Sequence, residues 1–246
     1  MTRLRLFRLR LAASAALLLL VSGVVRLLWY PGAYFAIFGT GKLLLILAAV
    51  NLVVGPGLSA FVYKHGKKGL KTDLRLLAGV EMIAVVLAVS LIYVRQPYFT
   101  VFAVDRFEAV SWREVDAAQI GFAELHKRPG HEPRLVYAEL PNDPQEFDRL
   151  MDETIFEGMK DIDRRPEFWR PYSSGIPVVK AAAKPLADLL AEDDSRAARL
   201  ARWLTRHGGR SVDFICLPLR GKSRDATMIL HADIGFPVAV VDVDPW

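Results

Sequence analysis

Three long apolar stretches occupy the first 95 residues, at about 11–28, 43–63 and 74–94. The third reads LRLLAGVEMIAVVLAVSLIYV, and no comparable stretch follows it. A helix of roughly 20 apolar residues is long enough to cross the ~30 Å hydrocarbon core of a bilayer. The sequence therefore predicts a membrane domain of three transmembrane helices, residues 1–95, followed by a polar domain, residues 96–246.

The formal net charge of +5 is unevenly distributed along the chain. Residues 1–94 contain 11 Lys and Arg against 2 acidic residues, whereas residues 95–246 contain 21 against 25. The positive charge thus belongs to the ends of the membrane helices, where it sets their orientation. A mildly acidic polar domain offers no electrostatic footprint for nucleic acid, so no nucleic-acid partner is expected.

Basic residues also predict the topology. Arg3, Arg5, Arg8 and Arg10 precede the first stretch, and a Lys-rich loop at 64–71 follows the second, whereas the loop 29–41 has no Lys or Arg. The positive-inside rule then places the N-terminus in the cytoplasm and residues 96–246 on the opposite side of the membrane, which in a bacterium is the periplasm. A signal peptide cleaved near Gly23 is the alternative, but the apolar run continues past that residue.

The pattern of the polar domain predicts an α+β fold. We expect a strand within 97–110, another at 134–140, and helices at 143–158, 185–191 and 195–207. Three further strand patterns, SVDFICLPL, ATMILHADI and PVAVVDV, are separated by short turns and predict a C-terminal antiparallel sheet. Asp143 and Glu146 suggest a capping box. The proline-containing stretch 161–183 suggests a long irregular connection.

Sequence motifs for catalysis or metal binding are missing. The segment FGTGK at 38–42 departs from a phosphate loop, and the five histidines share no metal-ligand spacing. The single cysteine, Cys216, alternates with apolar residues and is expected to be a buried thiol. Asp105 and Arg106, a charged pair inside a strand pattern, are expected to form a buried structural ion pair. We therefore expect no enzymatic activity, no cofactor and no metal.

Polar and helix-breaking residues inside the apolar stretches are the strongest functional candidates. Glu81 interrupts the third stretch, Asn51 lies near the middle of the second, and Gly55-Pro56-Gly57 follows Asn51. Ionisable residues within a membrane are costly and usually face protein. Asn51, Gly55, Pro56 and Glu81 could tie the three helices together, or they could form or support a groove for a transmembrane helix of a partner.

The sequence resembles the TfpX/TfpZ-type family of type IV pilin accessory proteins over essentially its whole length. The segments that carry the resemblance are LWYPGAYF at 28–35, NLVVGPGLS at 51–59, KKGLKTDL at 67–74, QPYFTVFAVDRFEAV at 96–110 and the closing DVDPW. The resemblance rests on the order and spacing of these segments. It supplies no catalytic residues.

This resemblance implies an inner-membrane accessory protein that assists type IV pilin assembly by binding the pilin subunit. The pilin, other assembly proteins of the inner membrane and membrane lipid are the implied partners. A membrane-anchored ligand-binding or sensory domain is the alternative, and a membrane enzyme acting on pilin or envelope glycans is a third. The ligand-binding or sensory domain would require a polar pocket in the outer domain, and the membrane enzyme would require convergent acids or a metal site.

Overall fold

A computed structural model describes residues 3–63, 69–126, 132–191 and 195–246. The chain divides into two compact units. Unit 1 comprises Met1–Trp29 and Gly39–Arg95, and unit 2 comprises Tyr30–Phe38 and Gln96–Trp246. The boundary after Arg95 separates the helices from the sheet, but the short loop 30–38 belongs with the sheet.

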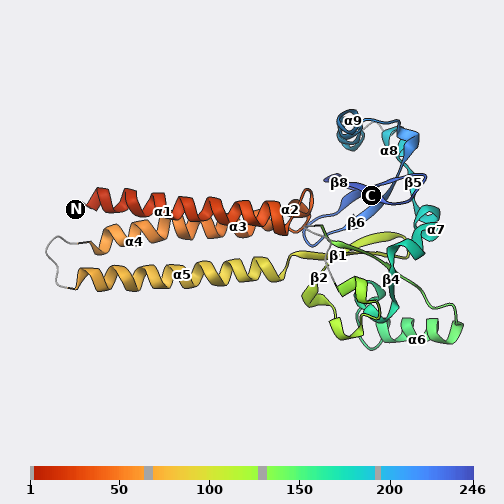
Figure 1. Cartoon of the computed structure of the whole chain (residues 1–246), viewed down its shortest axis with the longest axis horizontal. Helices are drawn as coiled ribbons and strands as arrows, with labels where there is room; N and C mark the ends of the chain where they lie inside the picture. The colour runs from red at the N-terminus through yellow and green to blue at the C-terminus, as the bar shows by residue number, and fades with distance from the viewer. Residues whose placement is uncertain (1–2, 64–68, 127–131, 192–194) are drawn as a thin grey trace. The chain divides into compact units, whose positions relative to one another are not determined.

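Unit 1 contains three long helices (Figure 1). The first is α1 (Arg3–Val24), extended by a π-helical turn η1 (Val25–Trp29), and the third is α5 (Leu70–Val94). The second consists of α3 (Thr40–Ala49), a π-helical turn η2 (Val50–Val54) and α4 (Gly55–Val62). All three are long and apolar enough to cross a membrane by length and composition.

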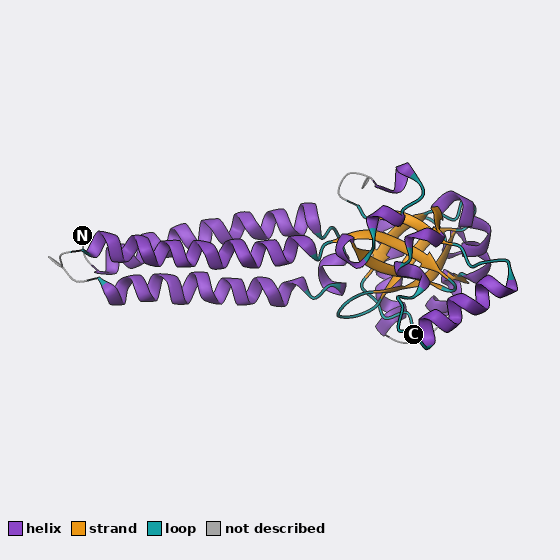
Figure 2. Ribbon diagram, turned by 90° about the horizontal axis from the view of Figure 1, so that it is seen from below, coloured by secondary structure: helices purple, strands orange, loops and turns teal. Residues whose placement is uncertain are grey.

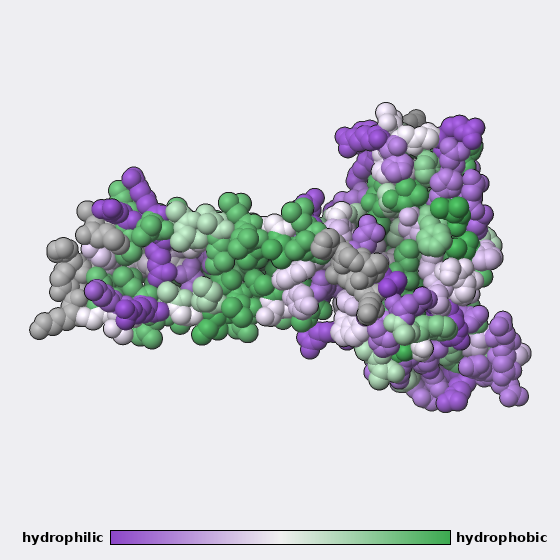
Figure 3. Space-filling view, viewed as in Figure 1, coloured by the Kyte–Doolittle hydropathy of each residue, from purple (hydrophilic) through white to green (hydrophobic). Residues whose placement is uncertain are grey.

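The exposed surface of these helices is strongly apolar (Figure 3). Large side chains such as Leu19, Leu45 and Phe61 are exposed, Phe61 by 82%. Monomeric soluble proteins rarely expose contiguous apolar surface on this scale. The arrangement is therefore that expected of helices that face lipid.

The sequence suggested that Gly55-Pro56-Gly57 would break the second helix, but the helix continues through this segment. The π-helical turn η2 comes directly before Gly55, and Pro56 occupies the first turn of α4. Val54 and Gly55 keep right-handed helical angles, so the helix is continuous here and Pro56 removes one N–H donor from its interior. The wider turn before it therefore lets the helix continue through the Gly-Pro-Gly sequence.

Unit 2 is built on an eight-stranded sheet, with helices packed around it (Figure 2). Its strand order is β4-β3-β1-β2-β6-β7-β8, and β5 also pairs with β6. The strands are β1 (Pro97–Ala103), β2 (Arg106–Ser111), β3 (Arg134–Ala138), β4 (Trp169–Pro171), β5 (Lys184–Pro185), β6 (Phe214–Arg220), β7 (Ala226–His231) and β8 (Pro237–Val241). The helices of unit 2 are α2 (Tyr34–Ile37), α6 (Pro144–Ile155), α7 (Tyr172–Ala182), α8 (Leu186–Ala191) and α9 (Ser195–His207).

The sheet is mixed, not purely antiparallel. Strands β6, β7 and β8 form the antiparallel meander that the sequence predicted, but β1 pairs with β3 and β2 pairs with β6 in parallel. Parallel pairing requires a long crossover. Residues 112–213 supply one between β2 and β6, and sequence periodicity does not reveal where such a crossover returns.

Three local expectations are also corrected. The stretch 97–110 is a hairpin that turns at Val104 and Asp105, with Val104 at a φ of 60°, and not one strand. The stretch 161–183 is not irregular but contains β4 and α7. Pro171 lies just before the helix, where proline is tolerated, and α7 continues through Pro177. The Asp143 side chain makes no capping hydrogen bond, so the expected capping box is not formed.

The loop 30–38 completes the core of unit 2. Tyr34 and Ile37 pack in one hydrophobic cluster with Phe102, Phe107 and Leu219 of the sheet. The Ile37 carbonyl accepts hydrogen bonds from three consecutive N–H groups at residues 222–224, at 2.8–3.4 Å. The loop and residues 96–246 must therefore lie on the same side of any membrane that the helices cross.

Candidate functional site

Charged side chains meet between α1 and α5. Glu81 Oε2 lies 3.6 Å from Arg10 Nη1, and the Ser14 hydroxyl donates to Glu81 Oε1 at 3.3 Å. Arg10 also donates to the Leu74 carbonyl at 3.1 Å. The two charged side chains are only 23% and 14% exposed, for Arg10 and Glu81 respectively. Glu81 is thus partnered within the bundle, as expected for an acid in an apolar helix.

Gly55 provides the space that the Glu81 carboxylate occupies. A Cβ atom at Gly55 would lie 2.2 Å from Glu81 Oε1, closer than real side chains permit. A Cβ atom at Gly57, in the same helix, would meet nothing within 4 Å. Small residues in membrane helices are expected to let neighbouring groups pack closely. Gly55 does this for the Glu81 side chain of α5.

The other two candidate residues are buried in the same bundle without joining this cluster. Asn51 is 3% exposed, and its Nδ2 donates to the Leu47 carbonyl at 3.0 Å. Its Oδ1 has no hydrogen-bond partner among the described residues, and the same is true of the Ser59 hydroxyl. Pro56 is buried beside Gly55. The structure therefore brings Gly55 and Glu81 together but does not link Asn51 to Glu81.

Sequence reasoning missed Arg10 and Ser14 as members of this cluster. Arg10 was assigned to the basic flank that sets topology, whereas its side chain reaches Glu81. An isolated acid in one apolar stretch and an arginine at the edge of another are a usable signal for such a pair. The register between the two helices, which sequence does not supply, decides whether they meet.

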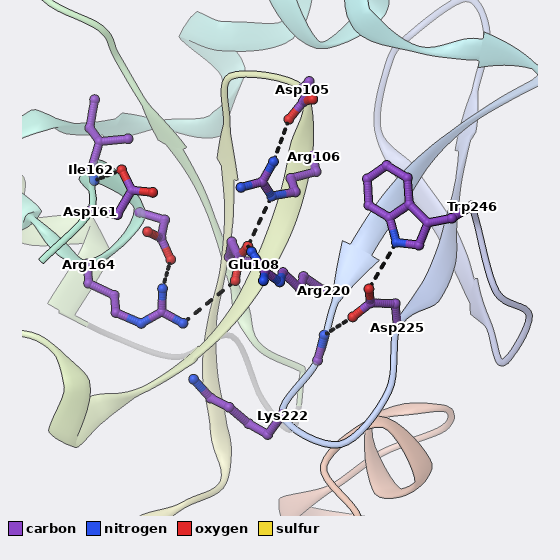
Figure 4. A network of polar contacts seen from close by, with 12 residues as sticks. Asp105, Arg106, Glu108, Asp161, Ile162, Arg164, Arg220, Lys222, Asp225 and Trp246 are labelled. Atoms are coloured by element: carbon purple, nitrogen blue, oxygen red, sulfur yellow. Dashed lines mark hydrogen bonds and ion pairs between the residues drawn. The ribbon is translucent and has the colours of Figure 1, made fainter. Parts of the chain in front are cut away.

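A second polar network lies in unit 2 around Glu108 of β2 (Figure 4). Glu108 accepts from Arg106 Nε at 3.1 Å and lies 3.6 Å from both Arg164 and Arg220. Arg164 also pairs with the buried Asp163. The network joins the β1–β2 hairpin, the short helical turn at 162–164 and the end of β6.

Glu114 extends this network to the β6–β7 turn. The Ser111 N–H and hydroxyl each donate to Glu114 at 2.8 Å, Arg164 Nε donates at 3.2 Å, and Lys222 also pairs with it. Burial opposes ionisation of Glu114, but the hydrogen bonds from Lys222 and Ser111 outweigh it and lower its pKa to about 2.

Asp163 is shifted in the opposite direction. Burial raises its pKa to about 6, although Arg164 opposes the shift, and nearby Glu108 adds to it. Carboxylates with separated pKa values are a pattern of acid–base sites. The described cavity, however, is lined by other residues. A structural role in tying segments together is therefore the simpler interpretation.

Asp105 and Arg106 form the expected ion pair, at 3.0 Å, but it is not buried. Asp105 lies in the hairpin turn and its side chain is 59% exposed. Exposed ion pairs contribute about 0–1 kcal/mol. The buried partner of Arg106 is instead Glu108, which sequence reasoning did not single out.

Cys216 is buried, and burial raises its pKa to about 12. Its thiol lies 3.4 Å from the Lys184 carbonyl. A thiol of this kind is inert at neutral pH. Within the described residues no group of three or more His, Cys, Asp or Glu side chains could hold a metal ion. His65, His131 and the acids at 192–194 lie outside those residues.

Unit 2 also contains a cavity of about 430 Å³. Its walls come from β8, the start of β3, the junction of β4 with α7, and the loop 31–34. The two tyrosines in the wall have engaged hydroxyls: Tyr34 bonds with Thr100 at 2.8 Å, and Tyr172 donates to the Gly235 carbonyl at 2.6 Å. The cavity thus presents their rings and residues of β8, together with the charged residues Glu124, Glu132 and Arg134.

The chain is similar to fimbrial assembly proteins of Dichelobacter nodosus. It is 29% identical over 175 residues to the serogroup I protein, covering 68% of this chain and 66% of the relative. It is 28% identical over 179 residues to the serogroup E1 protein, covering 71% and 68%. No family model and no solved structure matches the chain. The chain is therefore related to proteins named for fimbrial assembly, and the aligned region spans about two thirds of their length.

Proposed function

We propose that this protein is an inner-membrane accessory factor for type IV pilus assembly, of the TfpX/TfpZ type, and that it binds the pilin subunit before or during its incorporation into the pilus. The similarity to fimbrial assembly proteins carries this proposal. The three apolar helices support it, because a factor held in the membrane is positioned to meet membrane-embedded subunits.

The helical unit is proposed to contact the apolar helix of the pilin. Its exposed faces are apolar, so association would depend on close packing and not on the hydrophobic effect. Asn51, Gly55 and Pro56 are buried, so they would support the contact surface from behind. The Arg10–Glu81 pair would hold α1 against α5 and so fix the shape of that surface.

Unit 2 is proposed to lie in the periplasm and to contact the globular part of the same pilin. Joining two weak contacts in one molecule makes the second effectively intramolecular and raises the overall affinity. The Lys-rich loop that supports this topology falls partly on residues 64–68, outside the described residues. Reporter fusions after Val110 should be active only with a periplasmic enzyme; cytoplasmic activity would refute the topology.

We also propose that the protein acts without catalysis, cofactor or metal. The Glu108–Glu114 network is the strongest candidate for an active site, but its acids are engaged by Arg164, Arg220 and Lys222. The alternative function, a membrane-anchored ligand-binding or sensory domain, draws its support from the cavity in unit 2. A binding protein of that kind would not capture pilin.

Photo-cross-linking to pilin in membranes tests the proposal. A cross-linking residue at Phe61, on the exposed face of α4, should capture pilin in the wild-type background. Gly55→Leu displaces the Glu81 carboxylate and should weaken capture at an unchanged protein level. Gly57→Leu is the matched control, since a Cβ atom there would meet nothing within 4 Å. Absence of pilin capture in the wild type would refute pilin binding. Equal capture by both variants would show that the Gly55–Glu81 cluster does not support the pilin-contact surface.

A further inference from the structure

Strand β8 is an open edge of the sheet. It ends the strand order, and among the described residues its only partner strand is β7. The opposite edge, β4, has three residues and carries Arg170 and Pro171, which discourage further pairing. After Pro237, β8 reads Val-Ala-Val-Val and has no charged residue. Of the two edges, β8 is therefore the one able to accept another strand.

The hydrogen bonds of β7 reveal which backbone groups of β8 are unused. The His231 N–H donates to the Phe236 carbonyl, and the His231 carbonyl accepts from Gly235, so both groups of His231 point toward β8. Backbone direction alternates along a strand, so Ile229 and Thr227 point the same way. Their register partners are Ala239 and Val241.

Val240 lies between those two partners, so its N–H and carbonyl point away from β7. Asp242 should point outward as well, and its carbonyl indeed accepts from the Arg199 side chain at 3.2 Å. No described residue provides a comparable partner for Val240. A donor and an acceptor are therefore left open at the centre of this edge.

The cavity of about 430 Å³ lies beside this open edge. Residues 237–240 of β8 form one wall, and Leu135 of β3 and Tyr172 of α7 contribute to the others. Its volume falls within the range of about 300–1,000 Å³ that is typical of ligand sites. The cavity is lined by both apolar and charged side chains, Glu124, Glu132 and Arg134 among them. An unpaired strand edge next to such a hollow matches the requirements of an extended peptide, whose backbone pairs with the edge while alternate side chains enter the hollow.

We propose that β8 receives an extended segment of the pilin as an additional strand, with alternate side chains of that segment held in the cavity. This inference rests on the proposed function and names the surface of unit 2 that makes the second contact. A strand is a better fit than a small ligand because the open groups are the main-chain donor and acceptor of one residue, Val240, which is the pair that an added strand engages.

Cross-linking in the full-length protein tests this pairing. A photo-cross-linking residue at Ala239 should capture pilin, and one at Arg170, on the opposite edge, should not. Val240→Pro removes the outward N–H and should lower capture at Ala239 by about 3- to 10-fold, the effect of one main-chain hydrogen bond. Val240→Ala keeps that N–H and is the matched control. Continued protection of Cys216 from thiol reagents would show that each variant is folded.

A second variant does not alter the backbone of β8. Ser173→Trp, from the first turn of α7, should fill the cavity and lower capture at Ala239 while β8 stays intact. Capture at Phe61 without capture at Ala239, or equal capture by Val240→Pro and Val240→Ala, would overturn the pairing and leave the proposed function standing. Loss of capture at both Phe61 and Ala239 in the wild-type background would overturn the proposed function itself.

Discussion

The Arg10–Glu81 pair should couple α1 to α5 by a measurable free energy. The 3.6 Å separation corresponds to about 4–5 kcal/mol at an effective dielectric constant of about 20, and to about 1 kcal/mol in bulk water. Because both side chains are mostly shielded, we expect a coupling of about 3 kcal/mol. Glu81 lies eleven residues after Leu70, about 16 Å along α5, so an uncompensated charge there would be costly if α5 crosses a bilayer.

Replacing one partner should therefore destabilise the protein more than replacing both. Glu81→Gln and Arg10→Gln should each lower the free energy of unfolding by about 2–4 kcal/mol, since each leaves one charge unpaired. The double variant should lose much less free energy of unfolding than the sum of the two single losses. A double-mutant cycle, measured by denaturant titration of the detergent-solubilised full-length protein, gives the coupling directly. Strict additivity of the two losses would refute the interpretation that this pair holds the helices together.

Three further results are expected for unit 2. Gly221→Ala should destabilise it, because the added Cβ would meet the Arg224 carbonyl at 2.3 Å, whereas Gly121→Ala, with nothing within 4 Å, should be nearly neutral in urea unfolding. The pKa of Glu114 is about 2, below its ordinary value of 4.5. The ionised Glu114 should therefore add up to about 3 kcal/mol to the free energy of unfolding of unit 2 above pH 4.5, and this contribution should be lost as the pH falls toward 2. Glu114→Gln should flatten that acid limb in pH-dependent unfolding; an unchanged limb would contradict the assignment. Cys216 should react with thiol reagents only as fast as unit 2 unfolds, and rapid labelling of the native protein would show that its burial is wrong.

Elements with a local signal could be predicted from the sequence. The three apolar helices, α8, α9 and the β6–β8 meander each follow from periodicity, turn residues or composition within a short window. The first helix is already formed at Arg3, the first described residue, well before residue 11, because basic residues continue a helix as readily as apolar ones. Hydropathy locates the apolar core of a helix and not its end.

Long-range contacts could not be predicted in this way. No sequence pattern around Ile37 predicts that its carbonyl accepts hydrogen bonds from three N–H groups of the β6–β7 turn. Gly55 was recognised as a point of close approach, but its neighbour proved to be Glu81 of the same chain. Glu108 looks like an ordinary strand residue until Arg164 and Arg220 are brought beside it. In each case the partner lies more than 20 positions away, so only the tertiary fold identifies it.

The position of the loop 30–38 within unit 2 imposes an order on biosynthesis. The loop emerges between the first two long helices, about 185 residues before the turn that binds it, which at 5–20 residues per second is a delay of roughly 10–40 s. During that interval Tyr34 and Ile37 have no completed sheet to pack against. A chain whose first two helices insert incorrectly would keep this loop on the wrong side, and its sheet would then lack part of its core. If the helices cross a membrane, the stability of the sheet unit thereby becomes a check on correct insertion, because misinserted copies would be left partly unfolded and open to proteolysis.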